Sequence, residues 1–463
     1  MQVARLLDES YLGAFGDPRR AETGAKVLDA VKRQLTAAVP VLAADRNQTR
    51  QFLNFLDSEH VSSQEMLAHA GHITAVQAEK RHVLAICDTT EMNFATHTGR
   101  KRGFGTVGNG VDIGVFLHPT IAVDAKLGGL LGLVGAEVMN RTAGAACDHK
   151  LRGPEDKESR RWLDSACTAG DVLAGAAMIT MVQDREGDIF DQFARRPANV
   201  ELLVRAAQNR VVGPQQKLFA AAAAWPERDR YTIDVPPKGS QPGRKALVAL
   251  RWGEVTIRRP QQADPSLAET VTMRVVDVSE IDPPANCTAV RWCLLTTHAV
   301  ENVAQARRIV GWYRLRWVIE QVFRTLKSGG TDIESSQLTL PNTLLKLAII
   351  ALIAAVRVMQ LVLARDGSTG QSITAAVDEA DMPALRAINA TLEGSTEKLK
   401  NPHPETSLAY YAWIAARAGG WSGYTSRGYR PPGPKTIARG LKRLDAMIKG
   451  WHLANRYALH GLP

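Results

Sequence analysis

Short apolar runs that end in polar residues dominate the first half of the chain. They predict buried strands, because runs of this length bounded by turn residues are typical of strands in a sheet core. One segment between them, 157–173, has helical spacing instead. The predicted order is strand-strand-strand-helix-strand, and a short helix and a fifth strand complete the set. The predicted strands lie at 82–90, 112–124, 127–139, 178–188 and 200–207.

The remaining segments predict a helical region at each end and an interruption between them. Residues 1–70 show helical periodicity, with a basic side formed by Lys32, Arg33, Arg46 and Arg50. Residues 208–290 hold nine prolines and alternating apolar positions, which favours a mostly β insertion. We therefore predict three regions: 1–70, a core at 71–370, and a helical region at 371–463.

The stretch from Tyr313 to Lys327 has no Gly or Pro, and its apolar residues recur at spacings of three and four. This pattern predicts one continuous helix. Arg316 and Glu320 fall on the same predicted face as Tyr313 and Lys327, spread over roughly 21 Å. Such a face fits a row of phosphates, and it equally fits a solvated surface crossed by ion pairs.

Composition and charge narrow the partners. The chain has 463 residues, 57 Lys plus Arg against 47 Asp plus Glu, and a formal net charge of +10. This excess favours a polyanion such as nucleic acid. The odd cysteine count, without zinc spacing or an apolar leader, favours a reducing cytoplasm. The apolar run Leu347–Val356 is too short to span a bilayer, so no membrane association is expected.

Three carboxylates stand out: Asp88 and Asp184 at the ends of predicted strands, and Glu320 on the predicted helix. A few oxygen ligands suit Mg²⁺ or Mn²⁺, which complete their shell with water and substrate phosphates. Two such ions can serve both oxygens of a displacement at phosphorus. Asp at a strand end also commonly caps the following turn, so both interpretations stay open. The glycines of 99–110 match GxGxxG, but a strand pattern follows them, which argues against a dinucleotide site.

These residues resemble the motifs of bacterial cut-and-paste DDE transposases of the insertion-sequence-four group. The group's Y-x2-R-x3-E-x6-K pattern is similar to Tyr313, Arg316, Glu320 and Lys327. Its first acidic motif is similar to 88–90 (DTT), and its second to 184–188, where Gly187 replaces the usual Ala. Further similarity covers GDPRR at 16–20, the KExxxWL pattern beginning at Lys157, and AARAGGW at 415–421.

The resemblance implies an α/β fold: a ribonuclease-H-like catalytic core interrupted by the β insertion, with helical N-terminal and C-terminal domains. It implies Asp88, Asp184 and Glu320 as catalytic residues that bind two Mg²⁺ or Mn²⁺ ions. It further implies that Tyr313, Arg316, Lys327 and Arg205 hold the DNA backbone. Trp292 would stack on a base flipped out during hairpin formation; without the resemblance, Trp292 reads as a core residue.

The implied function is transposition of an insertion sequence: end nicking, hairpin formation, hairpin opening and strand transfer. The implied partners are double-stranded DNA, as terminal inverted repeats and as target, and a second copy of the chain in a synaptic complex. Residues 1–70 would bind the DNA ends, and the basic tail would mediate dimerisation. Two alternatives are a metal-dependent nuclease of the same fold and a transposase-derived DNA-binding inhibitor. The basic residues of the tail are Arg427, Arg430, Lys435, Arg439, Lys442, Arg443 and Lys449.

Overall fold

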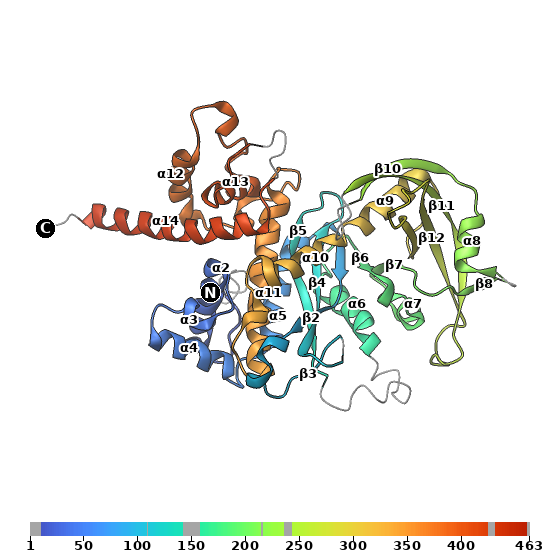
Figure 1. Ribbon diagram of the computed structural model, residues 1–463, viewed down its shortest axis with the longest axis horizontal. Helices are drawn as coiled ribbons and strands as arrows, with labels where there is room; N and C mark the ends of the chain where they lie inside the picture. The colour runs from blue at the N-terminus through green and yellow to red at the C-terminus, as the bar shows by residue number, and fades with distance from the viewer. Residues whose placement is uncertain are drawn as a thin grey trace. The chain divides into compact units, whose positions relative to one another are not determined.

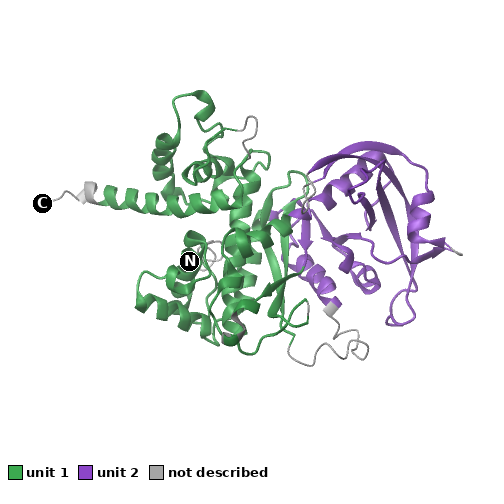
Figure 2. Ribbon diagram, in the orientation of Figure 1, with its two compact units in different colours: residues 1–77, 89–145, 318–463 green, residues 78–88, 146–317 purple. Residues whose placement is uncertain are grey.

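The computed structural model describes residues 11–108, 110–141, 158–213, 216–235, 243–424 and 431–460. Lys157, Arg427 and Arg430 lie outside this part of the chain. The chain divides into two compact units (Figure 2). Unit 1 comprises Met1–Gln77, Thr89–Ala145 and Val318–Pro463, and unit 2 comprises Ala78–Asp88 and Ala146–Trp317. The predicted region boundaries at 70 and 370 stay predictions.

Unit 2 is built on seven strands that are neighbours in the order β10-β11-β12-β13-β7-β6-β1 (Figure 1). The last three pairings in this order differ in direction: β13 is antiparallel to β7, whereas β7, β6 and β1 run parallel. The strands are β1 (His82–Cys87), β6 (Met178–Gln183), β7 (Val200–Arg205), β10 (Asp229–Val235), β11 (Arg244–Arg258), β12 (Thr270–Glu280) and β13 (Arg291–Thr296).

The sequence explains why the two halves of this sheet differ. In β1 and β6 every residue after the first is buried, so buried and exposed positions do not alternate. Such continuous apolar runs are typical of parallel strands covered on both faces. In β10 and β11 buried and exposed residues alternate, as in antiparallel strands with one face in water. Helices complete the unit: α6 (Arg161–Val172), α7 (Phe190–Arg195), α8 (Leu218–Ala224) and α9 (Val303–Arg314).

The segment predicted as a β insertion has strands as its main regular structure. Besides β10, β11 and β12 it contains the short pair β8 (Val211–Gly213) and β9 (Gln216–Lys217), and its described residues include one helix, α8. The pairs β10–β11 and β11–β12 are antiparallel neighbours along the chain. Local pairing of this kind follows from turn-rich sequence between alternating strands.

Unit 1 has a smaller antiparallel set of strands, all paired with β4 (Ile113–Asp124). Its partners are β2 (Thr90–Asn93), β3 (Gly105–Thr106) and β5 (Leu130–Met139). The N-terminal helices of the unit are α2 (Pro18–Gln34), α3 (Val39–Leu42), α4 (Arg46–Asp57) and α5 (Ser63–Ala78). Thr74 of α5 donates its hydroxyl to the Leu133 carbonyl of β5 at 2.7 Å, which fixes this helix against the strands.

The long helix α11 (Pro341–Ala364) forms the core of unit 1. Its 24 residues make it long and apolar enough to cross a membrane, and it extends beyond the predicted apolar run Leu347–Val356 at both ends. Its most apolar 18-residue window is 83% buried inside the protein, as in a core helix. The Lys346 ammonium donates to the carbonyls of Leu56 and Ser58 at the end of α4, where the helix dipole favours a cation.

The C-terminal part of unit 1 contains α12 (Met382–Leu392), α13 (Leu408–Ala418) and α14 (Pro434–His460). A Cβ at Gly440 would lie 1.7 Å from the Ala415 carbonyl oxygen, so glycine permits α13 and α14 to cross closely. At the C-terminal end of α13, Arg439 of the basic tail donates to the Gly419 carbonyl at 2.6 Å, and Arg443 donates to the Ala418 carbonyl at 2.8 Å. Two of the predicted DNA-binding or dimerisation cations therefore hold a helix end.

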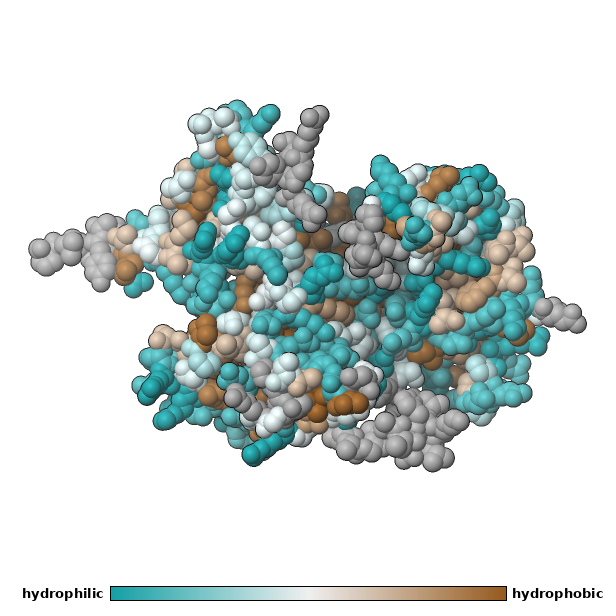
Figure 3. Space-filling model, viewed as in Figure 1, coloured by the Kyte–Doolittle hydropathy of each residue, from teal (hydrophilic) through white to brown (hydrophobic). Residues whose placement is uncertain are grey.

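The surface of unit 1 and of unit 2 is mainly hydrophilic in the face drawn in Figure 3, with brown residues scattered over it. Along α14, large apolar side chains become exposed towards the C-terminus, with Met447 40% and Leu453 55% exposed. In Figure 1 this end of α14 extends beyond the other helices of its unit.

Candidate active site

Three charged residues align at one edge of the parallel strands of unit 2. Ile86 of β1 is paired with Val182 of β6, so Asp88 and Asp184 follow in step two residues later. Gln183 of β6 is paired with Val204 of β7, which places Asp184 beside Arg205 in the same way. Neighbouring strands lie about 4.8 Å apart. The carboxyl ends of three adjacent strands thus carry an Asp, an Asp and an Arg.

Asp88 forms an ion pair with Arg316. The Arg316 Nη1 atom donates to Asp88 Oδ2 at 2.7 Å, and the two side chains are 17% and 18% exposed. Partial burial of both charges strengthens the pair relative to one in open water. The edge of the sheet therefore already stabilises positive charge beside this carboxylate.

Tyr313 stands at the centre of the remaining site residues of unit 2. Its side chain is 5% exposed, and its ring contacts Trp292 edge to face at 5.7 Å between centroids. Burial raises the pKa of the Tyr313 hydroxyl, an effect that nearby Arg316 and Arg205 oppose. The Arg205 guanidinium donates to the Arg291 carbonyl at 3.1 Å. Two arginines, a phenol and a half-buried indole therefore converge on this edge.

Asp184 also caps the turn that follows its strand. Its Oδ1 atom accepts the Glu186 N–H at 2.9 Å, the usual role of an Asp at the start of a short helix. Gly187 in this turn has a specific cause. A Cβ there would lie 2.4 Å from Gln183 Oε1, so the alanine common at this motif position would clash. Capping and ligand binding are compatible, because a carboxylate has two oxygens.

The stretch 313–327 is not one helix, contrary to the prediction. α9 ends at Arg314, a turn follows, and α10 (Trp317–Arg324) continues into a π-helical turn, Thr325–Gly329. The break arises where Leu315 and Arg316 donate to carbonyls three residues back instead of four. Such tightened turns are common at helix ends.

Glu320 and Lys327 therefore occupy different elements of unit 1. Glu320 lies in α10, four residues after Arg316. Lys327 lies in the π-helical turn, and its ammonium is 3.5 Å from Glu334 Oε1. That same oxygen accepts the Asn93 N–H of β2 at 3.0 Å. The structure thus brings together Asp88, Asp184, Arg205, Trp292, Tyr313 and Arg316 in unit 2, and places the other two in unit 1.

The donor set of the unit 2 edge suits a hard divalent cation. Mg²⁺ is usually bound through one or two carboxylates, with water and substrate phosphates completing its shell. Asp88 and Asp184 supply such a pair, and the Arg316 guanidinium on Asp88 shows that a cation is stabilised there. Among the residues that the structure describes, no group of three or more His, Cys, Asp or Glu side chains could hold a metal ion.

Residues 195–357 match the family model of the transposase DDE domain. The match supports a DDE transposase family, and with it an enzyme that acts on DNA. It contains Arg205, Trp292, Glu320 and the whole stretch 313–327. Asp88 and Asp184 precede the matched residues, so their assignment depends on the strand-edge geometry.

Sequence reasoning assigned no role to two other features of the chain. Asp188, the last acid of the second motif, is buried and paired with Arg210, and only long-range contacts reveal this. Trp317 is 38% exposed at the first position of α10, directly after Arg316. The signal for Trp317 in the sequence was a large aromatic residue between the two charged site positions Arg316 and Glu320.

The strand predicted after the glycine-rich loop is present as β4, where a dinucleotide motif would need a helix. Lys101 of this loop is not a solvated cation. The ammonium donates to the Ser336 and Leu338 carbonyls at 2.7 and 2.6 Å and lies 4.4 Å from the Phe94 ring centroid. Burial lowers the pKa of Lys101 to about 8. This lysine anchors the loop within unit 1.

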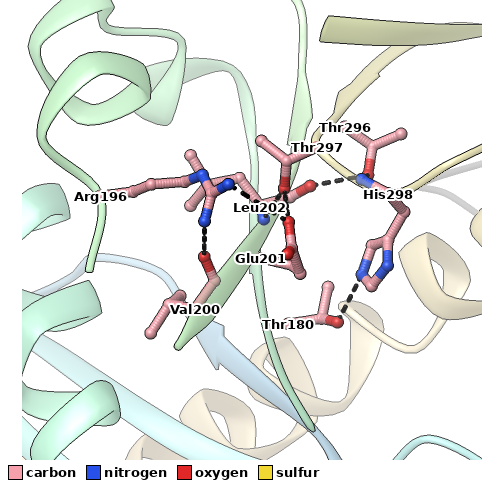
Figure 4. A network of polar contacts seen from close by, with 8 residues as sticks. All are labelled: Thr180, Arg196, Val200, Glu201, Leu202, Thr296, Thr297 and His298. Carbon is pink, nitrogen blue, oxygen red and sulfur yellow. Dashed lines mark hydrogen bonds and ion pairs between the residues drawn. The ribbon is translucent and has the colours of Figure 1, made fainter. Parts of the chain in front are cut away.

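A second polar cluster lies at the opposite edge of the same parallel strands (Figure 4). Thr180 of β6 contacts the Nε2 atoms of His82 and His298 at 2.8 and 2.7 Å. Glu201 of β7 accepts the Thr297 hydroxyl, and the same hydroxyl accepts the Leu202 N–H at 2.8 Å. We call His82, Thr180, Glu201, Thr297 and His298 the amino-edge network.

Proposed function

We propose that the protein is a cut-and-paste DNA transposase whose catalysis depends on divalent metal. In this proposal Asp88, Asp184 and Glu320 are the catalytic carboxylates and hold two Mg²⁺ or Mn²⁺ ions. When bound, the ions would activate the attacking oxygen and stabilise the leaving oxygen of each displacement at phosphorus. The proposal includes the insertion-sequence-four group as the specific relationship.

The observation that carries the proposal is the alignment of Asp88 and Asp184 at the ends of adjacent parallel strands. The rigid backbone of a sheet fixes the two carboxylates without help from a ligand. Glu320 follows Arg316 by four residues in the sequence, and Arg316 pairs with Asp88. These three facts, together with the matched DDE domain, support the acidic triad.

The basic and aromatic residues of the edge suit a DNA strand. Arg205 and Arg316 present guanidinium groups, which bind phosphate oxygens in a bidentate manner. Tyr313 and Lys327 would contact further phosphates. Trp292 is half-buried against Tyr313, with a ring that could stack on an extruded base.

Four successive displacements would complete the reaction. Water attacks at the end of the element and leaves a 3′-hydroxyl; that hydroxyl attacks the opposite strand and forms a hairpin. A second water opens the hairpin, and the freed 3′-hydroxyl attacks target DNA. Each step exchanges one oxygen on phosphorus for another, so one set of carboxylates can serve all four.

The two ends of the chain would provide recognition and assembly in this proposal. The exposed Arg46 and Arg50 of α4 are available to the DNA ends, whereas Arg33 of α2 is paired with Asp29 and Asp445. The exposed C-terminal half of α14 would contact a second copy in the synaptic complex. The proposed substrates are terminal inverted repeats and target DNA.

Strand transfer by the purified protein tests the proposal against simple cleavage. Pre-cut ends with free 3′-hydroxyl groups should be joined to a target plasmid in the presence of Mg²⁺. Glu320→Gln should abolish both Mg²⁺-dependent cleavage and joining while end binding persists. Glu379→Gln, at an exposed glutamate of the same unit, should behave as wild type.

The outcomes separate the alternatives. Cleavage without joining would identify a nuclease, and end binding without either reaction would identify an inhibitor. Undiminished cleavage by Glu320→Gln would refute the triad.

A further inference from the structure

Asp188 is a buried carboxylate that the proposed chemistry does not use. Its side chain is 0% exposed and lies in the turn after Asp184. Its Oδ1 atom accepts from Arg210 Nε at 3.2 Å and from Nη2 at 2.7 Å. The Asp188 carbonyl accepts a further bond from Arg210 Nη2 at 2.6 Å. A buried carboxylate held by this fork geometry is fixed in place.

The second carboxylate oxygen binds the backbone of the segment that follows β7. Asp188 Oδ2 accepts the N–H groups of Ala207 and Gln208 at 2.8 and 2.7 Å. Both Asp188 oxygens are thus occupied by protein donors, so this acid is not available as a metal ligand. Its partners all lie within residues 207–210.

This segment begins directly after Arg205, at the edge that carries Asp184. The Ala206 N–H donates to the Cys293 carbonyl of β13 at 2.8 Å. The chain that leaves β7 is therefore held by β13 at Ala206 and by Asp188 at Ala207 and Gln208. Asp188 lies four residues after Asp184, and its partner segment starts two residues after Arg205. One buried carboxylate therefore joins the loops that follow both residues.

We propose that Asp188, with Arg210, is a positioning residue that sets the Arg205 guanidinium beside Asp184 for phosphate binding. Asp188 does not touch DNA itself. The inference deepens the proposed function and rests on it. Without the Asp188 carboxylate, residues 207–210 would lose four hydrogen bonds, and the Arg205 guanidinium would be held by its bond to the Arg291 carbonyl.

The effect is measured as the salt dependence of end binding without metal. Each phosphate contact contributes about 0.9 to the slope of log K against log salt. One contact therefore changes the affinity by about eightfold for each tenfold change in salt concentration. Asp188→Asn should reduce the slope by about one contact, as Arg205→Gln does. The double variant should bind no more weakly than Arg205→Gln alone, because both changes remove the same contact.

Two further variants keep the test decisive. Asp191→Asn, at a half-buried acid of α7, is the matched control and should leave the slope unchanged. If Asp188→Asn does not fold, Arg210→Lys retains the charge but loses the fork, and it should reduce the slope in the same direction by a smaller amount.

An unchanged slope in the folded Asp188 or Arg210 variants would overturn the inference, as would losses that add to that of Arg205→Gln. An unchanged slope for Arg205→Gln itself would also overturn it, since Asp188 is proposed to act through that residue. Because binding is measured without metal, these results are independent of whether Glu320→Gln abolishes cleavage, which decides the proposed function.

Discussion

The two edges of the parallel strands in unit 2 carry similar residue types in opposite arrangements. At the carboxyl edge, Asp88, Asp184 and Arg205 follow adjacent strands and converge with Arg316, Tyr313 and Trp292. At the amino edge, Thr180 links His82 to His298. Thr297 links Glu201 to the backbone, and Figure 4 shows Thr297 and Glu201 with Thr180 and His298. The same sheet positions both groups.

The difference lies in how the polar atoms are satisfied. Amino-edge hydroxyls act as bridges between neutral or singly charged neighbours, so this network stabilises the fold internally. Carboxyl-edge residues are charged, partly exposed and gathered around two acids, an arrangement that favours a charged ligand. The comparison predicts that substitutions at the carboxyl edge alter DNA chemistry, and that those at the amino edge alter stability.

Among the carboxyl-edge residues other than the carboxylates, the largest expected effect is at Trp292. Trp292→Ala should leave the first nick and reduce hairpin formation by about fivefold to 150-fold, because a lost base stack costs about 1–3 kcal/mol. Gel analysis of end-labelled DNA separates nicked and hairpin products. Trp292→Phe, which keeps an aromatic face, should retain most hairpin formation. Equal losses in nicking and hairpin formation would instead place Trp292 in the core.

At the amino edge, Thr180→Val should lower the free energy of unfolding by about 1–3 kcal/mol, since the rings of His82 and His298 lose a buried partner. Urea denaturation measures this change. The cleavage rate of the folded variant should match wild type. A large loss of cleavage with unchanged stability would break the comparison.

His298 gives the amino edge a pH dependence. Burial lowers the pKa of its imidazole, Arg196 and Arg308 act in the same direction, and Glu201 opposes them. His82, Thr180 and Trp312 complete its surroundings. As pH falls below about 6.5, the unfolded chain binds a proton that the folded protein resists, so stability decreases.

His298→Asn should remove this contribution. Between pH 7 and 5 the free energy of unfolding of wild type should fall faster than that of the variant, by less than about 1.4 kcal/mol per pH unit. Urea denaturation at several pH values measures both slopes. If the free energy of unfolding of wild type and of His298→Asn falls equally with pH, the His298 imidazole has the same pKa in the folded and unfolded protein.

The smallest expected effect concerns Arg316, which occupies Asp88 in the DNA-free protein. Arg316→Gln should bind Mn²⁺ about fivefold more tightly without DNA, because removing a competing cation is worth roughly 1 kcal/mol. Electron paramagnetic resonance counts the free Mn²⁺. Arg314→Gln is the matched control, since Arg314 contacts the Asp234 carbonyl instead. Weaker Mn²⁺ binding by Arg316→Gln would contradict the competition.

Local pattern sufficed for much of this arrangement. Buried strands that stop at Asp88 and Asp184 follow from apolar runs, and their alignment follows once parallel pairing is known. The break after Arg314 did not follow, because helical periodicity persists across the turn. The Asp188–Arg210 pair was equally hidden, since its bonds join residues about twenty positions apart.

Longer-range placement was the main limit. The basic tail read as a solvated face, yet Arg439 and Arg443 point at the end of α13. Lys101 read as part of a basic loop, yet it is held by two carbonyls. The charge of a basic residue does not show whether its side chain binds DNA or donates hydrogen bonds to backbone carbonyls of the protein.

The most direct test of the central claim is the metal dependence of end cleavage by Asp184→Cys. A thiolate is a poor ligand for Mg²⁺ and a better one for softer divalent ions. The account predicts a loss of about a thousandfold or more in Mg²⁺, since a displaced ion forfeits several kcal/mol, with partial recovery in Mn²⁺. Undiminished cleavage in Mg²⁺, or an equal loss with both ions, would contradict Asp184 as a metal ligand.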